Sequence, residues 1–159
     1  MKVSDLLEEK FILSEFKVET KEEIISELVD LFKNDPRVSN LNDVKTCVLE
    51  REKIMSTGVG KGFAIPHGKT NSITDILAAF GKSEKPINYD ALDGEPVQLV
   101  FLLIGKDAFV GKHIKLLSRI SRLMNSDEFR EKLVNSIDKN EILQIFKEEE
   151  PKGRIIEEK

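Results

Sequence analysis

The hydrophobic and polar positions of the chain follow two periods, one typical of helices and one typical of strands. A short helix is predicted at residues 4–9 and a strand at 11–13. Thr20 and Glu23 then form a capping box, which begins a helix because it satisfies backbone N–H groups that the first turn leaves free. This helix is predicted to run to residues 34–36, Asn-Asp-Pro, which end it. Its apolar face consists of Ile24, Ile25, Leu28, Leu31 and Phe32.

The middle of the chain contains one further helix and two buried strands. Residues 42–55 have helical spacing, whereas residues 76–80 form a short apolar run. Residues 97–104 are apolar at every position except Gln98, which is typical of a central strand covered on both faces. Residues 86–96, between these strands, are rich in turn-forming residues.

The C-terminal third of the chain is predicted to be helical. A loop at residues 105–111 leads into a helix at 113–124. Ser126 is placed to cap the next helix, and residues 138–141, Asp-Lys-Asn-Glu, are placed to cap the last one. The residues expected to face inward from these two helices are Phe129, Leu133 and Ile137, and then Ile142, Ile145 and Phe146.

The composition is ordinary for a single globular domain. The chain has 159 residues, of which 40% are apolar and 34% charged. Its formal net charge of −4 argues against a nucleic-acid-binding protein, which would usually have a basic face. Residues 149–159 are charged and contain Pro151 and Gly153, so we expect a frayed tail after one domain of residues 1–148. Strands interleaved with helices predict an α/β sandwich in which helices cover both faces of a sheet.

Neither a membrane span nor a secretion signal is visible in the sequence. No apolar run is long enough to cross a bilayer, and the first ten residues are too charged for a signal peptide. Cys47 is the only cysteine, so an internal disulfide is excluded and a reducing compartment is expected. We therefore expect a cytoplasmic protein without direct membrane insertion, in which Cys47 is a core residue of helix 42–55.

The segment 51–70 carries the candidate chemistry. Pro66 fixes its own backbone angle and Gly68 is free to turn, so His67 is held rigidly at the end of a short apolar strand, residues 63–65. Glycines upstream allow the backbone N–H groups to turn inward, as in anion-binding nests, and these are Gly58, Gly60 and Gly62. His67 is therefore a candidate nucleophile that carries a phosphoryl group; the alternative is a turn histidine without chemistry.

Two other residues fit an anion site. Arg51 shares its helix face with apolar neighbours three and four positions away, namely Cys47, Val48, Ile54 and Met55. An inward-facing guanidinium needs a carboxylate partner, an extended path to the surface, or a phosphate. His113 lies at the N-terminal end of its helix, where N–H groups attract anions, although a helix-start histidine can also donate one structural hydrogen bond. Ser56 and Thr57 are candidate hydroxyl donors, or caps of a helix or loop end.

Residues 56–68, S-T-G-V-G-K-G-F-A-I-P-H-G, resemble the signature of the EIIA subunits of the phosphoenolpyruvate-dependent sugar phosphotransferase system (PTS). The resemblance is to the fructose–mannitol type, which also includes the nitrogen-regulatory EIIA proteins. It extends over nearly the whole chain and includes M-K-V-S-D-L-L at the start, Y-D-A-L-D-G-E-P-V-Q-L-V-F-L-L at 89–103 and H-I-K-L-L-S-R-I-S-R-L-M at 113–124.

The resemblance implies a fold and a set of roles. It implies a mixed sheet of roughly five strands flanked by helices. It also implies that His67 accepts a phosphoryl group through Nε2 from the phosphohistidine of the small carrier HPr, and passes it to a cysteine of an EIIB component. Arg51 matches the helix arginine of the family and His113 its second active-site histidine. These residues and the loop would stabilise the transferring group without a cofactor or a metal.

The docking surface is expected to surround His67 with apolar residues. The candidates are Phe63, Ile65, Phe109 and Val110, of which Phe63 and Ile65 are equally typical of a core. The segment before His113, G-K-D-A-F-V-G-K, differs from the acidic, glycine-containing approach that is common in the family, and this difference bears on how the loop docks a partner.

Two functions are consistent with the resemblance. In sugar uptake, His67 relays phosphate to a fructose-type EIIB, and EIIB and the membrane component EIIC act in trans because this sequence contains neither. In regulation, the phosphorylation state of His67 is read by a binding partner, as in the nitrogen-regulatory proteins. The start of the chain and residues 89–97 favour the fructose type. A hydrolase that uses His67 as a base is disfavoured because no Ser or Cys nucleophile motif accompanies it.

Overall fold

A computed structural model describes residues 2–157 of the chain, and the side chains of residues 2–150. The first part contains α1 (Val3–Leu6), a 3-10 turn (Glu9–Phe11), β1 (Ile12–Phe16), α2 (Lys21–Asp30) and α3 (Leu41–Ile54). The strands β2 (Gly58–Gly60), β3 (Phe63–Ala64), β4 (His67–Lys69), β5 (Leu77–Ile87) and β6 (Val97–Gly105) follow. A second 3-10 turn (Asp107–Phe109) precedes α4 (Val110–Met124), α5 (Asp127–Val134) and α6 (Lys139–Glu157).

The strands form one mixed sheet, as predicted. Its order is β1-β5-β6-β3-β2, and β4 also pairs with β6. β5 and β6 are antiparallel, whereas β1 is parallel to β5, and both β3 and β4 are parallel to β6. The sheet has six strands rather than five, because the segment after α3 contributes three very short strands.

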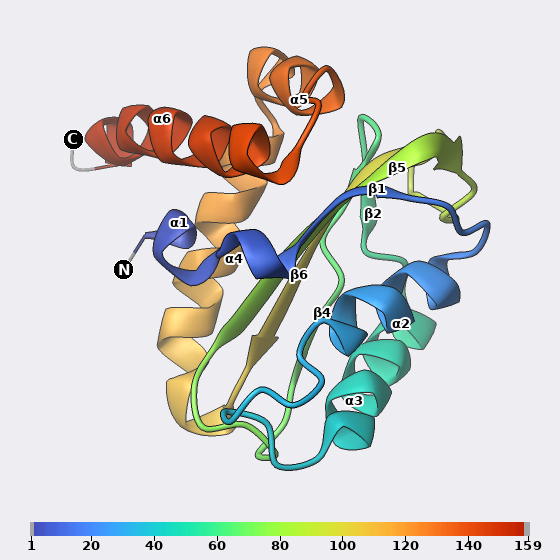
Figure 1. Cartoon of the computed structure of the whole chain (residues 1–159), viewed down its shortest axis with the longest axis vertical. Helices are drawn as coiled ribbons and strands as arrows, with labels where there is room; N and C mark the ends of the chain where they lie inside the picture. The colour runs from blue at the N-terminus through green and yellow to red at the C-terminus, as the bar shows by residue number, and fades with distance from the viewer. Residues whose placement is uncertain (1, 158–159) are drawn as a thin grey trace.

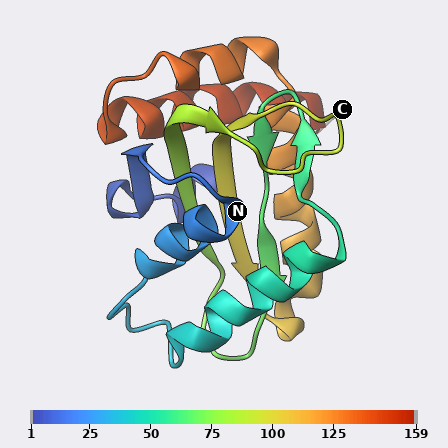
Figure 2. The same cartoon turned by 90° about the vertical axis from the view of Figure 1, so that its right-hand side faces the viewer.

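Helices cover both faces of the sheet (Figures 1 and 2). α2 and α3 lie on one face, and α1, α4, α5 and α6 on the other. The side chains of β6 alternate between the two cores. Leu99, Phe101 and Leu103 face the α4 side, while Val100, Leu102 and Ile104 face the α2 side. This double burial explains the continuous apolar run and confirms the prediction of a central strand.

Side-chain caps begin three helices where the sequence predicts them. The Thr20 hydroxyl accepts the Glu23 N–H at 3.2 Å, and the Ser126 hydroxyl accepts the Phe129 N–H at 3.2 Å. In α6 the Glu141 N–H donates to the Asp138 carboxylate at 2.9 Å. Each cap satisfies a backbone donor that the first helical turn leaves without a partner.

One prediction about the C-terminal part is wrong. Ile137 was expected to face inward but is 81% exposed, in the turn between α5 and α6. α6 continues through Glu157 into the segment expected to fray, and residues 158–159 lie outside the described residues. Glu150 is buried in this helix, and its carboxylate accepts the N–H groups of Val3 and Ser4 at the start of α1.

Candidate active site

The site lies at an edge of the sheet, between a helix from each layer. β4 runs parallel to β6, with His67 paired to Leu103 and Lys69 to Gly105, and no other described strand pairs with β4. His67 and Lys69 share one face of the strand, the face toward α4, because side chains alternate along a strand. Gly68 faces α3 on the other side. Arg51 of α3 therefore approaches His67 around the unpaired edge of β4.

A hollow of about 660 Å³ opens at this edge. Arg51 from α3, His67 and Lys69 from β4, and His113 from α4 line it. The remaining lining residues are Cys47, Glu50, Ile54, Gly68, Asp107, Val110, Ile114 and Leu117. The tertiary structure thus brings together the three residues that the sequence singled out, which lie up to 62 positions apart (113 − 51) in the chain.

His67 is oriented by the backbone of its own segment. Its Nδ1 lies 2.8 Å from the carbonyl oxygen of Ile65. A carbonyl can only accept, so Nδ1 carries the proton and Nε2 keeps its lone pair. Burial lowers the pKa of His67, and the positive charges of Arg51 and Lys69 lower it further, while the Ile65 hydrogen bond and the charge of Glu52 oppose the shift. The ring is therefore neutral at neutral pH and presents a nucleophilic Nε2.

His113 is a second, more deeply buried imidazole. It is 3% exposed, and its ring centroid lies 5.9 Å from that of His67, with 54° between the planes. Burial lowers the pKa of His113 to about 4, and the nearby His67 and Lys69 add to the shift. Its Nδ1 is buried without a hydrogen-bond partner. α4 begins at Val110, so His113 lies at the end of the first turn rather than at the first residue of the helix.

Gly105 makes room for the ring of His113, and the sequence analysis missed this. A Cβ atom at position 105 would lie 2.2 Å from Nδ1 of His113. Such a distance is far inside van der Waals contact, so only glycine fits while the ring stays where it is. The pairing of β4 with the end of β6 places Gly105 on the same face as Lys69. A glycine directly after a buried strand was the available signal.

Arg51 lies at the boundary of the core instead of facing it. Its guanidinium Nη1 donates to the carbonyl of Met55 at 2.9 Å, and among the residues whose side chains are described no carboxylate forms an ion pair with it. Two of the neighbours expected to face the core are exposed, Ile54 by 80% and Met55 by 58%. The prediction of an inward-facing Arg51 is wrong because another residue of the last helical turn, Glu52, takes the inward position.

Glu52 is a buried carboxylate with a full set of partners. It is 4% exposed and accepts the Thr57 N–H at 2.8 Å, the Thr57 hydroxyl at 2.5 Å and the Tyr89 hydroxyl at 3.1 Å. The ammonium of Lys21 lies 3.5 Å away. Burial raises the pKa of Tyr89, and the negative charge of Glu52 raises it further, so the phenol stays protonated and donates. Periodicity assigns such a glutamate to solvent, so the sequence analysis missed it.

Ser56 and Thr57 have structural partners rather than free hydroxyls. The Ser56 hydroxyl donates to the Tyr89 carbonyl and accepts the Gly58 N–H, each at 3.1 Å. The Thr57 hydroxyl is engaged by Glu52. These contacts match the capping alternative considered for both residues.

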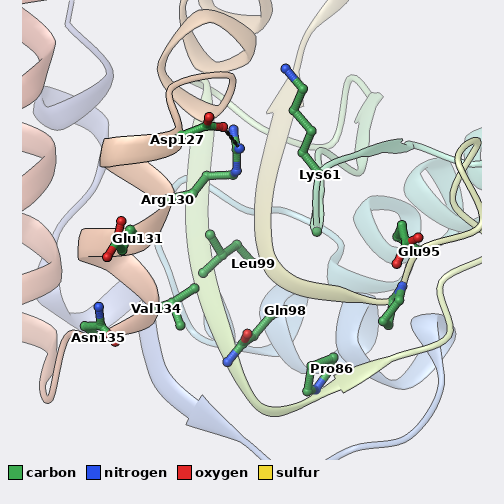
Figure 3. Close-up of a pocket in the computed structure, with 12 residues that line it drawn as sticks. Lys61, Pro86, Glu95, Gln98, Leu99, Asp127, Arg130, Glu131, Val134 and Asn135 are labelled. Carbon is green, nitrogen blue, oxygen red and sulfur yellow. Dashed lines mark hydrogen bonds and ion pairs between the residues drawn. The ribbon is translucent and has the colours of Figure 1, made fainter.

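The structure does not bring the glycines Gly58, Gly60 and Gly62 to His67. β3 pairs with an earlier part of β6 than β4 does: Phe63 pairs with Leu99, four residues from the partner of His67, and β2 pairs with the other side of β3. Four strand residues span about 13 Å. Gly60 and Gly62 have positive φ, 125° and 83°, and Gly62 lines a second hollow of about 630 Å³ between β6 and α5 (Figure 3). The N–H of the intervening Lys61 donates to Asp93 at 3.0 Å, so the loop braces a turn.

Gly68 is required for packing rather than for a turn. It has no positive φ, but a Cβ atom there would lie 2.7 Å from Sγ of Cys47 and 3.0 Å from its backbone carbon. α3 therefore packs directly on β4, which positions Arg51 against His67. Cys47 itself is half-buried in the wall of the hollow, and burial raises the pKa of its thiol to about 11.

The mouth of the hollow has an apolar rim. Ile54, Val110 and Ile114 are exposed by 80%, 45% and 60%, and Leu117 is half-buried beside them. Of the residues predicted for this role, Val110 lines the hollow. Phe63 and Ile65 are core residues, 1% and 5% exposed, and Phe109 packs against that core. We call Ile54, Val110, Ile114 and Leu117 the apolar rim.

Two further observations concern the part of the chain that the structure describes. Within it, no cluster of three or more His, Cys, Asp or Glu residues is arranged to hold a metal ion. None of its helices combines the length and apolar character needed to span a bilayer.

Similar proteins include fructose-specific PTS proteins and nitrogen regulatory proteins. A "PTS system fructose-specific EIIABC component" of Bacillus subtilis is 34% identical over 146 residues, which are 92% of this chain and 23% of that protein. A "Nitrogen regulatory protein" of Bradyrhizobium diazoefficiens is 35% identical over 148 residues, 92% of this chain and 95% of that protein. The chain thus spans about a quarter of the first relative and nearly all of the second.

A solved structure agrees with the fold at high similarity. The nitrogen regulatory protein IIA-Ntr from Neisseria meningitidis superimposes with a TM-score of 0.85 and 30% identity, covering 91% of this chain and 98% of that one. IIA mannitol from Escherichia coli shares the fold with a TM-score of 0.73 at 19% identity. The family model for the EIIA 2 component matches residues 5–149. This chain therefore belongs to the EIIA 2 family of the phosphoenolpyruvate-dependent sugar phosphotransferase system.

Proposed function

We propose that this chain is a phosphocarrier of the phosphotransferase system and that His67 carries the phosphoryl group. The observation that carries the proposal is the contact between Nδ1 of His67 and the Ile65 carbonyl, because it leaves Nε2 unprotonated and facing the hollow. The lone pair of Nε2 attacks the phosphorus of phospho-HPr in line. A new N–P bond forms, the N–P bond of HPr breaks, and the HPr imidazole leaves with the electron pair.

The second transfer reverses the roles. A cysteine thiolate of an EIIB component attacks the same phosphorus, an S–P bond forms, the N–P bond to His67 breaks, and Nε2 regains its lone pair. No cofactor or metal takes part in either step. The site must stabilise the transferring group more than the phosphohistidine, since a carrier has to release its cargo.

Three side chains supply positive charge or N–H donors to the equatorial oxygens of the transferring group. Arg51 is free of a carboxylate partner and can turn from the Met55 carbonyl to an oxygen. His113 acts as a neutral donor. A proton on its buried Nδ1 would have no acceptor, so the proton belongs on Nε2. Lys69 lies on the same strand face as His67 and supplies a third donor, which the sequence analysis overlooked.

The apolar rim is the docking surface for two proteins that visit in turn. A transient interface of this kind needs an apolar centre around the reacting atom and polar residues outside it. A related fold illustrates the second encounter, because enzyme IIAMTL of Escherichia coli has been solved in complex with phosphorylated enzyme IIBMTL. We infer that HPr and a cytoplasmic EIIB, with membrane EIIC in trans, are the partners here.

Fructose-type sugar uptake is the physiological role that we propose. It rests on the sequence features at the start of the chain and at residues 89–97, and on the fructose-specific relatives. The full-length match to nitrogen regulatory proteins favours a second candidate, in which the phosphorylation state of His67 controls a binding partner. Transfer from the phosphorylated chain to a panel of EIIB proteins separates the two: rapid transfer to a fructose-type EIIB supports uptake, and failure with every EIIB supports regulation.

The carrier chemistry is tested with phosphoenolpyruvate, EI and HPr. The wild-type chain should gain one acid-labile, base-stable phosphate, and His67→Ala should gain none. Arg51→Ala should remain folded and accept the group about 10- to 100-fold more slowly, which corresponds to losing a charge-assisted hydrogen bond of about 1.5–3 kcal/mol. Retention of the label in His67→Ala would refute the site.

A further inference from the structure

The buried carboxylate of Glu52 holds Thr57, a residue that is connected both to His67 and to the segment that contacts Arg51. One oxygen accepts the Thr57 N–H at 2.8 Å, and the other accepts the hydroxyls of Thr57 and Tyr89 at 2.5 and 3.1 Å. A carboxylate has no proton to give, so it accepts in each of these contacts, and the two hydroxyl oxygens also lie 3.1 Å from each other. Thr57 is thereby held through its backbone and its side chain at the same time.

The contact continues from Thr57 to the reactive histidine. The Thr57 carbonyl accepts the Ile65 N–H at 3.1 Å, and the Ile65 carbonyl accepts Nδ1–H of His67 at 2.8 Å. Hydrogen bonds therefore run without a gap from Glu52 through Thr57 and Ile65 to His67. The last of them sets the tautomer and the direction of the ring.

The same carboxylate also shapes the surroundings of Arg51. The guanidinium of Arg51 donates to the carbonyl of Met55, the extended residue that ends α3 (φ −163°, ψ 139°). Met55 lies between Glu52 and Thr57 in the chain, and Glu52 bridges this loop by holding Thr57. The position of the Met55 carbonyl, and with it the resting position of the guanidinium, follows from that bridge.

Stability alone is a poor explanation for this arrangement. Burying a carboxylate costs several kcal/mol before any contact repays it, and apolar replacements of buried ionic groups are often as stable. The ammonium of Lys21, at 3.5 Å, offsets part of this cost. Positioning of the active-site residues explains the buried Glu52 better. Glu52 is next to Arg51 in the chain, and three successive hydrogen bonds connect it to His67.

We propose that Glu52 is a positioning residue that sets the location of the Arg51 guanidinium relative to the His67 ring. The inference rests on the proposed phosphocarrier function. Glu52 does not touch the phosphoryl group; it acts through Thr57, which transmits its hold to Ile65 on one side and to Met55 on the other.

Phosphoryl transfer from phospho-HPr tests the proposal in matched variants. Glu52→Gln places an amide NH₂ group against the donors of Thr57 and Tyr89. It should lower kcat at least about tenfold, which corresponds to about 1.4 kcal/mol. Thr57→Val removes the hydroxyl at constant shape and should lower kcat several-fold, whereas Thr57→Ser should restore it. KM for phospho-HPr should stay unchanged, because the apolar rim is intact. Glu27→Gln, an exposed glutamate of α2, is the control and should match the wild type.

Two comparisons separate positioning from simple loss of structure. In an Arg51→Ala background, Glu52→Gln should have a smaller effect, because the guanidinium to be positioned is gone and only the connection to His67 remains. Full additivity of the two substitutions would overturn the proposal. So would wild-type transfer rates in folded Glu52→Gln and Thr57→Val, with folding checked by thermal unfolding.

A second readout needs no phosphoryl donor. Ring ¹⁵N NMR of the wild type should show His67 protonated at Nδ1, and Thr57→Val or Glu52→Gln should shift part of the population to the other tautomer. If the wild type takes no phosphate from HPr, the proposed function fails, and the NMR result still decides whether Glu52 positions the ring. An unchanged tautomer in both variants would refute the connection to His67.

Discussion

Gly105→Ala is the substitution whose effect follows most directly from the geometry. The new Cβ atom would lie 2.2 Å from Nδ1 of His113, and ordinary contact begins at about 3.4 Å. The ring or the end of β6 must therefore move by about 1 Å. Position 105 pairs with Lys69 at the end of β6, so the backbone resists and the ring of His113 is displaced.

We expect Gly105→Ala to reduce the rate of phosphoryl transfer strongly and the free energy of unfolding moderately. A displacement of about 1 Å in a positioned group can cost about 100-fold in rate. Overpacking of a buried site costs about 1–3 kcal/mol in the free energy of unfolding. We therefore expect Gly105→Ala to slow phosphoryl transfer from HPr by one to two orders of magnitude while the protein remains folded at 25 °C.

The assay is rapid-quench transfer from ³²P-labelled phospho-HPr, with urea unfolding in parallel. Gly111→Ala in α4 is the matched control. Nothing lies within 4 Å of a Cβ atom there, so it should leave the rate unchanged. In a His113→Ala background the clash disappears, and Gly105→Ala should then have little further effect on either rate or stability. A rate within twofold of the wild type for the single variant would refute the argument.

The remaining predictions concern pH, packing and charge. Burial holds the pKa of His113 at about 4, below its unfolded value of 6.5, so the unfolded chain binds more protons than the folded chain between these pH values. The free energy of unfolding is therefore highest above pH 6.5 and falls by up to about 3 kcal/mol as the pH drops to 4. Urea unfolding should show a smaller loss in His113→Gln. Gly68→Ala should destabilise by about 1–3 kcal/mol because its Cβ meets Cys47, and Cys47→Ala should restore only part of this because the backbone carbon lies at 3.0 Å. Lys69→Met should slow transfer several-fold, whereas Lys17→Met, at an exposed position just after β1, should not; equal rates would remove Lys69 from the site.

The local signals of the chain were sufficient for most of the helices and for the central strand, but they missed β2 and β4 and the second half of β5 (Leu77–Ile87). The caps at Thr20 and Ser126 act over three residues, so the sequence contains both partners of each hydrogen bond. The apolar run of β6 reflects burial on two faces and needs no knowledge of the neighbours. The pattern around His67 predicted a rigid presentation, and the contact between His67 and Ile65 is itself local, only two residues apart.

The orientation of Arg51 could not be predicted by periodicity. Periodicity assumes that apolar residues face the core and charged ones face water, and the last turn of α3 breaks this rule. Glu52 is buried because Lys21 and Tyr89, far away in the chain, supply its partners. No pattern within a helix reveals such partners. Periodicity therefore assigned the inward-facing position of the last turn of α3 to Arg51, although Glu52 occupies it.

The prediction that Gly58, Gly60 and Gly62 lie beside His67 could not be made correctly for a related reason. Alternate glycines are compatible with an anion-binding nest, and equally with a tight edge strand. β3 and β4 follow one line along β6, so the loop that precedes β3 ends about 13 Å from His67. Similarly, the hydrogen-bond partners of the buried Glu150 are N–H groups of α1, at the opposite end of the chain.

The sequence by itself determined most of the helices, the double burial of β6 and the candidacy of His67, because these depend on contacts between near neighbours or on composition. Only the tertiary structure decided that Arg51, Lys69 and His113 surround one ring, that Gly105 and Gly68 are glycines for lack of space, and that Glu52 is buried. Those properties depend on atoms that are distant in the chain and adjacent in space, and a one-dimensional pattern contains no information about such distances.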